Sequence, residues 1–333
     1  MINSAVIGFG GISRVHIAAI SSLENARLIA VCDTNPAKKD LAPTGTVFYN
    51  DYEEMLTKEK LDVAHICLPH FLHYPVAKRV AEKGINVFAE KPLALNAKEG
   101  DEYCKLESKH GVKICLCFQN RINTTTETLL GLLRSGEYGK VMGVRGSVAW
   151  YRSKEYYQSS PWRSSMAESG GGCMINQAIH TMDLMQYFAG SPIVSIKGTI
   201  GKVLDYGIEV EDTAVGRIVF ENGALGLFTA SVANYTDENV EISVRCEKAD
   251  FVLREKNLFK VKDGEQELLV SDSRSFAGKQ VYGSGHIKLI DRFYQALEGN
   301  DVPYIHPEEG MPSLKMIDAI RKSSETGEAV YFS

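Results

Sequence analysis

Short apolar runs alternate with helical patterns over the first 120 residues, and this alternation constrains the fold more than any other feature. The apolar runs occupy residues 2–7, 27–32, 62–68, 86–90 and 112–118. Parallel strands need long crossover connections, which are usually helices, so strands that alternate with helices predict a doubly wound parallel sheet. At 333 residues the chain is long enough for two domains. We therefore expect an α/β domain over residues 1–122.

A glycine-rich turn follows the first apolar run. Residues 8–13 have the sequence Gly-Phe-Gly-Gly-Ile-Ser, and a helical pattern comes directly after them. Gly8 and Gly10 permit a tight turn and let the main chain approach a pyrophosphate, whereas Ser13 stands where the dinucleotide fingerprint usually has Gly or Ala. An ordinary turn uses the same residues, so the string alone is weak evidence for nucleotide binding.

Asp33 strengthens the nucleotide interpretation. It ends the second apolar run, roughly 20 residues beyond the glycine turn, where an acidic residue accepts hydrogen bonds from ribose hydroxyls. A carboxylate repels a 2′-phosphate, so NAD is expected and NADP is disfavoured, although Lys38 and Lys39 moderate the preference. The sequence thus predicts a Rossmann domain that binds NAD.

Lys91 stands at the end of another strand. Residues 86–90 form an apolar run that delivers this lysine to the strand end, and Pro92 stops the strand there. Open parallel sheets bind ligands at the carboxyl ends of their strands. An isolated lysine is usually solvated, but at this position its ammonium could face both a cofactor and a substrate.

The ends of the other strands supply further candidates. His70 and His73 follow the run over 62–68, and because two histidines without a third ligand make a poor metal site, no metal is predicted and His73 is expected beside the nucleotide. Asn120 and Arg121 follow the last strand and should reach the same crevice. The cofactor contacts predicted in this domain are Gly8, Phe9, Gly10, Gly11, Ile12, Asp33, Thr34, Leu68, Pro69, His70, His73, Glu90, Lys91 and Asn120.

Strand-like runs dominate the second part of the chain, residues 123–333. They occupy residues 141–150, 193–200, 213–220, 224–232, 239–246 and 249–254. Because short turns join several of them, we expect a largely antiparallel open sheet in a second α/β domain. Helical patterns cover residues 127–135, 285–298 and 308–325, and the last of these is a candidate to pack back on the first domain.

One more helix is expected over residues 173–188, preceded by the triple glycine 170–172. Asn176, His180 and Asp183 are spaced so that a helix would project them toward one side. Such a polar trio is often only a solvated face. Three consecutive glycines are costly in backbone entropy, however, and favour a site where main chain passes close to a ligand.

Lys91 and His180 match the needs of one reaction. Oxidation of a secondary alcohol by hydride transfer requires a base for the hydroxyl proton and a positive group near the developing oxyanion. An imidazole suits the first task and an ammonium the second. Asn176 could fix the imidazole tautomer or hold a substrate hydroxyl, and Asp183 could orient the ring or simply lie on the helix surface.

Aromatic and arginine residues crowd the segment before the triple glycine. They are Tyr151, Arg152, Tyr156, Tyr157, Trp162 and Arg163. Aromatic faces stack on the C–H faces of a sugar while guanidinium groups bond its hydroxyls or carboxylates, so a sugar or sugar acid is the expected substrate class. The predicted substrate contacts are Lys91, Arg121, Tyr151, Trp162, Arg163, Asn176 and His180.

Composition excludes several function classes. The 37 Lys and Arg against 42 Asp and Glu give a net charge of −5 without a basic face, which argues against a nucleic-acid partner. No apolar run reaches membrane-span length. The sequence enters a strand almost at once, without room for a signal peptide, and its seven cysteines include no Cys-x-x-Cys pair, so a reducing cytoplasmic location is expected.

These motifs together resemble the Gfo/Idh/MocA family of oxidoreductases across essentially the whole chain. The resemblance rests on the glycine turn at 8–13, Glu90-Lys91-Pro92, Asn120-Arg121, Trp162-Arg163 and the segment 170–183. It implies that Lys91 is the catalytic lysine and His180 the proton-relay histidine. It also implies cofactor contacts at Trp162, Arg163 and Tyr282, and a homodimer or homotetramer assembled through the C-terminal sheet.

One position departs from the family pattern. Many members carry aspartate where this chain has Asn176, and an amide cannot raise the pKa of His180 as a carboxylate would. Members that are similar in having Asn-Gln-x-x-His act on sugars or sugar nucleotides, which puts inositol in doubt as the substrate but leaves a sugar or another cyclitol. Two alternatives to a dehydrogenase stay open: a dinucleotide-binding sensor without catalysis, and a glycosidase that uses NAD for transient oxidation.

Overall fold

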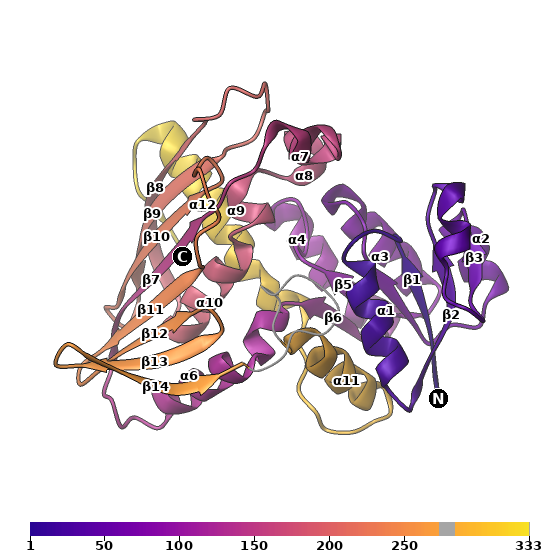
Figure 1. The fold of residues 1–333 in the computed structure, drawn as a ribbon, viewed down its shortest axis with the longest axis horizontal. Coiled ribbons are helices and arrows are strands. Elements are labelled where there is room, and N and C mark those ends of the chain that lie inside the picture. The colour runs from indigo at the N-terminus through magenta and orange to yellow at the C-terminus, as the bar shows by residue number, and fades with distance from the viewer. Residues whose placement is uncertain (273–283, 333) are drawn as a thin grey trace. The chain divides into compact units, whose positions relative to one another are not determined.

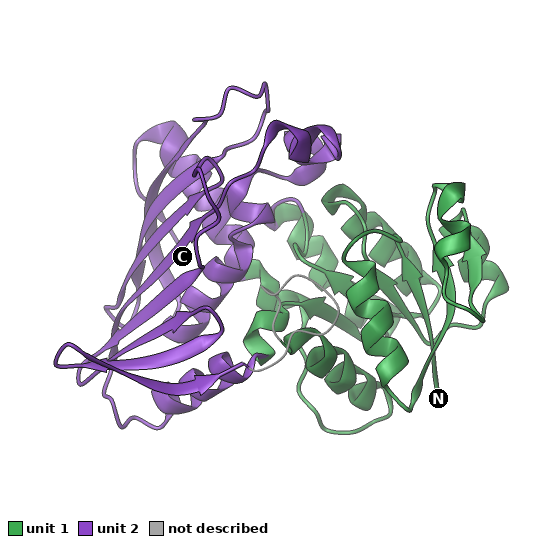
Figure 2. Ribbon diagram, viewed as in Figure 1, with its two compact units in different colours: residues 1–94, 98–122, 274–311 green, residues 95–97, 123–273, 312–333 purple. Residues whose placement is uncertain are grey.

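The computed structural model describes residues 1–272 and 284–332. They form two compact units (Figure 2). The first unit comprises residues 1–94, 98–122 and 274–311, and the second comprises residues 95–97, 123–273 and 312–333. This division differs from a single boundary at residue 122, because the chain returns to the first unit before it ends in the second.

The first unit is built on a six-stranded parallel sheet with the strand order β3-β2-β1-β4-β5-β6. The strands are β1 (Ile2–Ile7), β2 (Ala26–Cys32), β3 (Val47–Tyr49), β4 (Val63–Ile66), β5 (Asn86–Glu90) and β6 (Ile114–Cys117). Every adjacent pair runs parallel. The predicted doubly wound sheet is therefore confirmed, and β3 is a short edge strand that the sequence pattern did not indicate.

All four residues of β4 are buried, as expected for a parallel sheet that helices cover on both faces. The helices are α1 (Ser13–Ser22), α2 (Tyr52–Lys58), α3 (His73–Glu82), α4 (Ala97–Cys104), α5 (Leu106–His110) and α11 (Gly285–Leu297). Short 3₁₀ helices η1 (Pro36–Leu41), η2 (His70–Leu72), η3 (Gln119–Ile122) and η6 (Pro307–Gly310) complete the unit. In Figure 1, α1 packs beside α11.

The second unit contains a nine-stranded sheet with the order β14-β13-β12-β11-β7-β10-β9-β8-β15. Its strands are β7 (Val141–Ala149), β8 (Ile193–Gly201), β9 (Thr213–Phe220), β10 (Leu225–Ser231), β11 (Glu241–Cys246), β12 (Asp250–Arg254), β13 (Asn257–Lys262), β14 (Glu265–Ser271) and β15 (Val330–Tyr331). Only the pair β7 and β10 is parallel among the pairs that the structure describes. The largely antiparallel open sheet is confirmed.

The second unit also contains helices, several of which pack against its sheet. They are α6 (Thr124–Arg134), α7 (Lys154–Gln158), α8 (Met166–Ser169), α9 (Cys173–Asn176), α10 (Ile179–Ala189) and α12 (Met311–Thr326), with the 3₁₀ helix η4 (Pro161–Ser164). α10 lies on β7 and β11. Ser323 of α12 accepts a hydrogen bond from the backbone N–H of Gly198 in β8, so α12 belongs to this layer.

The prediction of a single helix over residues 173–188 is wrong in one respect, because this segment forms two helices, α9 and α10. The backbone N–H groups of Gln177 and Ala178 both donate to the carbonyl of Cys173, which interrupts the regular α-helical pattern. Asn176 therefore lies on α9, whereas His180 and Asp183 lie on α10. The helical spacing that placed the three on one side does not apply across the break.

The triple glycine has a packing reason inside the second unit. A Cβ atom on Gly172 would overlap the backbone carbonyl of Glu211, and one on Gly171 would overlap the Arg321 guanidinium. Gly170 has a φ of +70°, and its Cβ would lie 2.6 Å from the carbonyl oxygen of Leu95. Close main-chain packing thus explains these glycines, which do not by themselves indicate a ligand.

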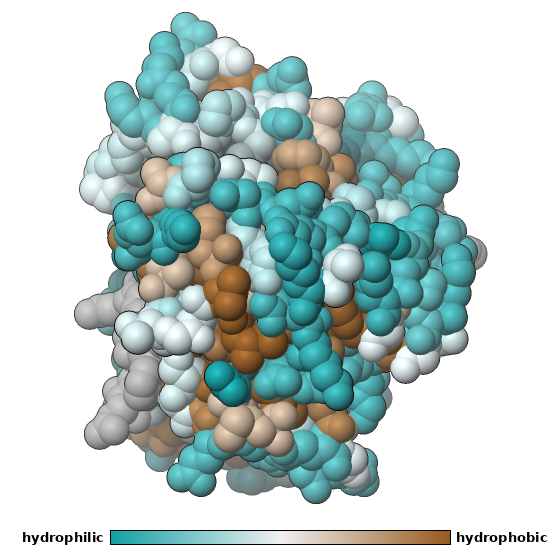
Figure 3. All heavy atoms as spheres, turned by 90° about the vertical axis from the view of Figure 1, so that its right-hand side faces the viewer, coloured by the Kyte–Doolittle hydropathy of each residue, from teal (hydrophilic) through white to brown (hydrophobic). Residues whose placement is uncertain are grey.

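The surface agrees with the lack of a membrane-length apolar run. Within the described ranges, every helix is too short or too polar to cross a membrane. Figure 3 shows one face of the molecule, on which hydrophilic residues predominate and apolar residues form smaller groups, the most marked of them near the middle.

Candidate active site

The glycine turn after β1 lies where the strand order of the first sheet reverses, between β1 and β4. Gly8 has a φ of +92°, its backbone N–H donates to the carbonyl of Cys32, and a Cβ there would overlap the carbonyl of Cys67. Cβ atoms on Gly10 and Gly11 would meet no atom within 4 Å. Only glycine fits at position 8, and the open main chain beyond it suits a pyrophosphate at the start of α1.

Asp33 is held beside this turn at the end of β2. Its Oδ2 accepts hydrogen bonds from the backbone N–H of Phe9 at 2.9 Å and from Lys38 Nζ at 2.6 Å, and its Oδ1 accepts one from the backbone N–H of Asn35. Burial acts to raise the pKa of Asp33, but these hydrogen bonds outweigh it and lower the pKa. The carboxylate is thus fixed and ionised, with the ammonium of Lys38 directly on it.

His73 joins the ends of β4 and β5. Its Nδ1 lies 2.7 Å from the carbonyl oxygen of Pro92, and its Nε2 lies 2.8 Å from that of Leu68. A neutral ring can donate only one of these bonds. Burial lowers the pKa of His73, and the two hydrogen bonds oppose this. Because both nitrogens face carbonyls of the chain, the imidazole braces the strand ends, and His70 lies buried beside it.

Lys91 follows β5 directly and is half-buried. Burial lowers the pKa values of His73 and His286, and the charge of Lys91 acts in the same direction on both. The ammonium therefore lies near two buried imidazoles. The side chain of Glu90, expected at the cofactor, instead lies in the core, where its Oε1 is 2.9 Å from His16 Nε2.

Arg121 has a partner within the first unit. Its guanidinium donates from Nη1 to the Glu309 carboxylate at 2.6 Å and from Nη2 to the Glu309 carbonyl at 3.0 Å, and only 4% of the residue is exposed. This pairing ties η3 to η6. The substrate contact predicted for Arg121 therefore stays a prediction without structural support. Asn120, in the same 3₁₀ helix, is half-exposed and accepts a hydrogen bond from Gln119 Nε2.

Several predicted site residues of the second unit come together around Tyr156. Its hydroxyl accepts hydrogen bonds from Gln177 Nε2 at 3.0 Å and Asn176 Nδ2 at 3.4 Å. The guanidinium carbon of Arg163 lies 4.3 Å from the centre of the Tyr156 ring and 5.5 Å from that of Trp162. Tyr156 and Gln177 were not among the predicted site residues, although Tyr156 stands in the aromatic segment and Gln177 follows Asn176.

The remaining predicted residues lie at more varied places. His180 is half-buried on α10, and Asp183 is buried with only 1% exposed, so it is not a helix-surface aspartate. Tyr151 is exposed, and its backbone N–H donates to Asp237 Oδ1 at 2.8 Å. Tyr282 lies outside the described residues.

One buried cluster of the first unit has the donor types of a metal site. One ligand atom from each of His16, Glu90, Cys117 and His286 lies within 4.8 Å of the others. The separation of His16 Nε2 from Glu90 Oε1 is 2.9 Å. Two ligands of a tetrahedral zinc ion lie about 3.3 Å apart at normal bond lengths. The observed spacing fits a direct hydrogen bond between these side chains.

Two family models match the chain. Residues 2–118 match the model described as an oxidoreductase family with an NAD-binding Rossmann fold, and residues 126–252 match the GFO/IDH/MocA C-terminal domain. The first match spans the six strands of the first sheet, and the second begins in α6 and ends within β12 of the second sheet.

Similar proteins cover the same length. D-glucoside 3-dehydrogenase of Escherichia coli is 25% identical over 98% of this chain and 96% of its own length. Myo-inositol 2-dehydrogenase of Thermotoga maritima is 23% identical over 98% of this chain and 97% of its own. The WlbA dehydrogenase of Bordetella pertussis, solved with NADH and UDP-GlcNAcA, has a TM-score of 0.86 and 28% identity, with 100% of this chain and 99% of that one covered. This chain is therefore an NAD-binding dehydrogenase of the Gfo/Idh/MocA family of oxidoreductases.

Proposed function

We propose that the protein transfers a hydride between NAD and a secondary alcohol or ketone of a sugar, a cyclitol or a sugar derivative. The observation that carries the proposal is Lys91 at the carboxyl end of β5, close to the point where the strand order reverses. The relatives named for a glucoside and for inositol support this substrate class.

Lys91 would stabilise charge on the reacting oxygen. In the oxidative direction the carbon loses a hydride to the nicotinamide and the hydroxyl loses its proton, so negative charge develops on the oxygen until the C=O bond forms. A positioned ammonium lowers the energy of that state more than that of the neutral alcohol.

His180 would take the hydroxyl proton, which requires its imidazole to reach the same substrate oxygen as Lys91. Its neighbour on α9, Asn176, is neutral, so it offers a hydrogen bond without a charge. A neutral imidazole is suited to accept a proton at neutral pH.

The cluster around Tyr156 would bind the sugar. Trp162 and Tyr156 provide aromatic faces, and Arg163 and Arg152 stack on them with guanidinium groups that also reach hydroxyls or carboxylates.

Two alternative functions can be separated from the dehydrogenase. A sensor that catalyses no reaction would need neither Lys91 nor His180. An NAD-dependent glycosidase would show no net NADH, so absorbance at 340 nm during incubation with a sugar panel separates both alternatives from the dehydrogenase.

We also propose a reducing, cytoplasmic location, which the seven free cysteines support.

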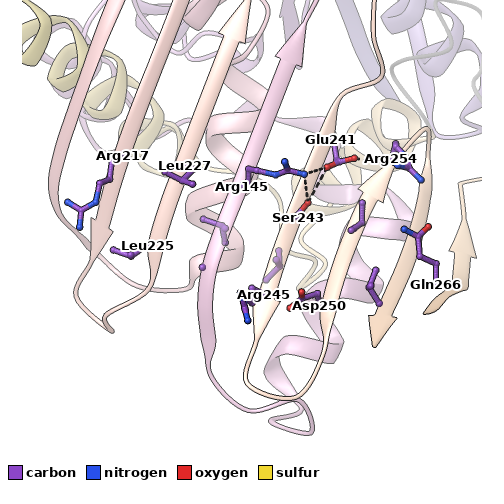
Figure 4. Close-up of a pocket in the computed structure, with 15 residues that line it drawn as sticks. Arg145, Arg217, Leu225, Leu227, Glu241, Ser243, Arg245, Asp250, Arg254 and Gln266 are labelled. Atoms are coloured by element: carbon purple, nitrogen blue, oxygen red, sulfur yellow. Dashed lines mark hydrogen bonds and ion pairs between the residues drawn. The ribbon is translucent and has the colours of Figure 1, made fainter. Parts of the chain in front are cut away.

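We further propose that two copies of the chain pair through the open face of the nine-stranded sheet. Alternate residues of β9 and β10 are buried toward the helices, whereas Val215, Leu225 and Leu227 are exposed on the other side. Figure 4 shows this face, which is hollowed and carries arginines beside acidic groups such as the paired Arg145 and Glu241. Apolar side chains ringed by both charge signs suit a self-complementary interface.

Replacement of Lys91 by methionine tests the central role. The Lys91→Met variant should bind NAD nearly as the parent does but turn over more slowly by on the order of a hundredfold or more, since it loses the charge near the reacting oxygen. Lys83→Met, at an exposed position of the same unit, is the control. Steady-state turnover and NAD titration measure the two effects, and parent-like turnover would make Lys91 a bystander.

His180→Ala tests proton transfer. In the parent, oxidation should slow at acidic pH, because a protonated imidazole cannot accept the hydroxyl proton. The variant should be slower and lose this inflection. His110→Ala is the matched control and should keep both the parent rate and the parent inflection. An inflection that survives in His180→Ala removes this histidine from the proton transfer.

The bond between Lys38 and Asp33 sets the cofactor preference. We expect kcat/KM to be higher with NAD than with NADP. Lys38→Ala should increase the ratio of the two values by on the order of tenfold, because it frees the carboxylate and removes a cation that could bind a 2′-phosphate. Asp33→Asn should decrease this ratio, and equal kcat/KM values for the two cofactors in the parent would contradict the expectation.

The sheet interface is tested by a charge in its apolar part. Leu227→Glu, at a position 55% exposed within one unit, should shift the protein toward monomer, because an interface would have to bury a charged carboxylate in place of an apolar side chain. Val203→Glu, outside the sheet strands and 70% exposed, should not. Sedimentation velocity reads the outcome. A monomeric parent, or a Leu227→Glu variant that stays assembled, rejects this interface.

A further inference from the structure

An unbroken series of four hydrogen bonds runs through the core of the first unit and ends on Glu90. Ser4 Oγ lies 2.7 Å from Tyr294 OH, which lies 2.8 Å from His65 Nε2. His65 Nδ1 lies 2.9 Å from His16 Nδ1, and His16 Nε2 lies 2.9 Å from Glu90 Oε1. The residues come from β1, α11, β4, α1 and β5, and none is more than 6% exposed.

Donor and acceptor chemistry gives this series one direction. A carboxylate can only accept, so His16 Nε2 carries a hydrogen and its Nδ1, in a neutral ring, must accept. His65 then donates from Nδ1 and accepts at Nε2 from the Tyr294 hydroxyl, whose oxygen accepts from Ser4. Every donor points toward Glu90, and bonds aligned in this way strengthen one another. The reverse direction requires an extra proton on the chain.

The groups around Glu90 are consistent with one buried negative charge. Burial acts to raise the pKa of Glu90, but His16 and His286, whose Nε2 lies 3.6 Å from Oε1, hold it well below its usual value. Burial raises the pKa values of Cys67 and Cys117, and Glu90 adds to the effect. Both thiols therefore stay protonated. Burial lowers the pKa of His65 and keeps that ring neutral, as the direction of the series requires.

This charge is carried by the residue directly before Lys91. Glu90 and Lys91 are consecutive residues at the end of β5. Both act on the buried rings of His73 and His286, where Glu90 raises the pKa and Lys91 lowers it. Because consecutive Cα atoms lie about 3.8 Å apart, the two charged groups are within reach of each other's field.

We propose that Glu90 is a positioning residue: the directed series from Ser4 through Tyr294, His65 and His16 keeps its carboxylate ionised, and this charge keeps Lys91 in the ammonium form that the reaction needs. The inference rests on the proposed function, since it concerns how the reactive lysine is held charged. It assigns a purpose to polar groups in a core that apolar residues could otherwise fill.

The direction of the series can be measured without turnover. In protein labelled with ¹⁵N-histidine, long-range ¹H–¹⁵N spectra at neutral pH should show His16 protonated at Nε2 and His65 protonated at Nδ1. His16→Asn and His65→Asn assign the signals. The opposite tautomers, or a His16 ring protonated at both nitrogens, would overturn the proposed direction.

The effect on Lys91 is tested by removing the charge or weakening its support. Glu90→Gln should lower kcat by about tenfold or more and move the alkaline fall in activity to lower pH, because the ammonium loses its proton more easily without a nearby negative charge. Tyr294→Phe, which removes the donor to His65, should shift the profile in the same direction by a smaller amount. NAD affinity should not change in either variant.

A second buried tyrosine supplies the control. Tyr103 is also 0% exposed in the first unit, and within the described residues its hydroxyl has no hydrogen-bond partner. Tyr103→Phe should leave the pH profile unchanged, so a shift seen only in Tyr294→Phe cannot come from general loosening of the core. Where Glu90→Gln does not fold, this tyrosine pair decides the question.

The outcomes separate this inference from the proposed function. If Lys91→Met abolishes turnover while Glu90→Gln and Tyr294→Phe keep the parent pH profile, the hydride-transfer role stands and the positioning role of Glu90 is wrong. If the parent oxidises no sugar, the proposed function fails, and the histidine tautomers still decide the direction of the series.

Discussion

The close approach of Gly8 to the ends of two strands is the contact on which the cofactor site depends. Its N–H bonds the carbonyl of Cys32, and its missing side chain leaves room for the carbonyl of Cys67. β1 can therefore pair with β2 and β4 up to the turn, which places Asp33 and the end of β4 on either side of it. A side chain at position 8 would force these strand ends apart and disturb the whole crevice.

Local pattern predicted the sheets because their signals are local. Apolar runs of buried strands such as β4 stand out from their flanks, and the alternation with helices fixes parallel pairing. Two of the strands that the pattern missed lack this signal: β14 is mostly exposed, and β15 has two residues. The break between α9 and α10 was missed because both segments are apolar enough to continue one helix.

The sequence located candidate site residues whose place is defined by the end of a strand, and it missed contacts that a distant residue supplies. Asp33 and Lys91 stand at strand ends, which the sequence shows. Nothing near Arg121 in the sequence indicates Glu309, 188 positions away, which occupies its guanidinium. Gly172 likewise owes its lack of a side chain to Glu211. Such pairings arise only when the chain is folded, so sequence pattern leaves them open.

The polar core of the first unit is expensive, and its place in the fold is informative. A carboxylate removed from water loses several kcal/mol of solvation, and apolar side chains of similar volume often stabilise a core at least as well as a buried ion pair does. Apart from His65, the strands on either side of Glu90 consist of apolar residues and cysteines. Its carboxylate ends the strand that carries Lys91, and all four bonds of the series direct their donors to it. A role for the Glu90 charge beside Lys91 therefore explains why the fold carries the desolvation cost of a buried carboxylate at the end of β5, which packing alone does not explain.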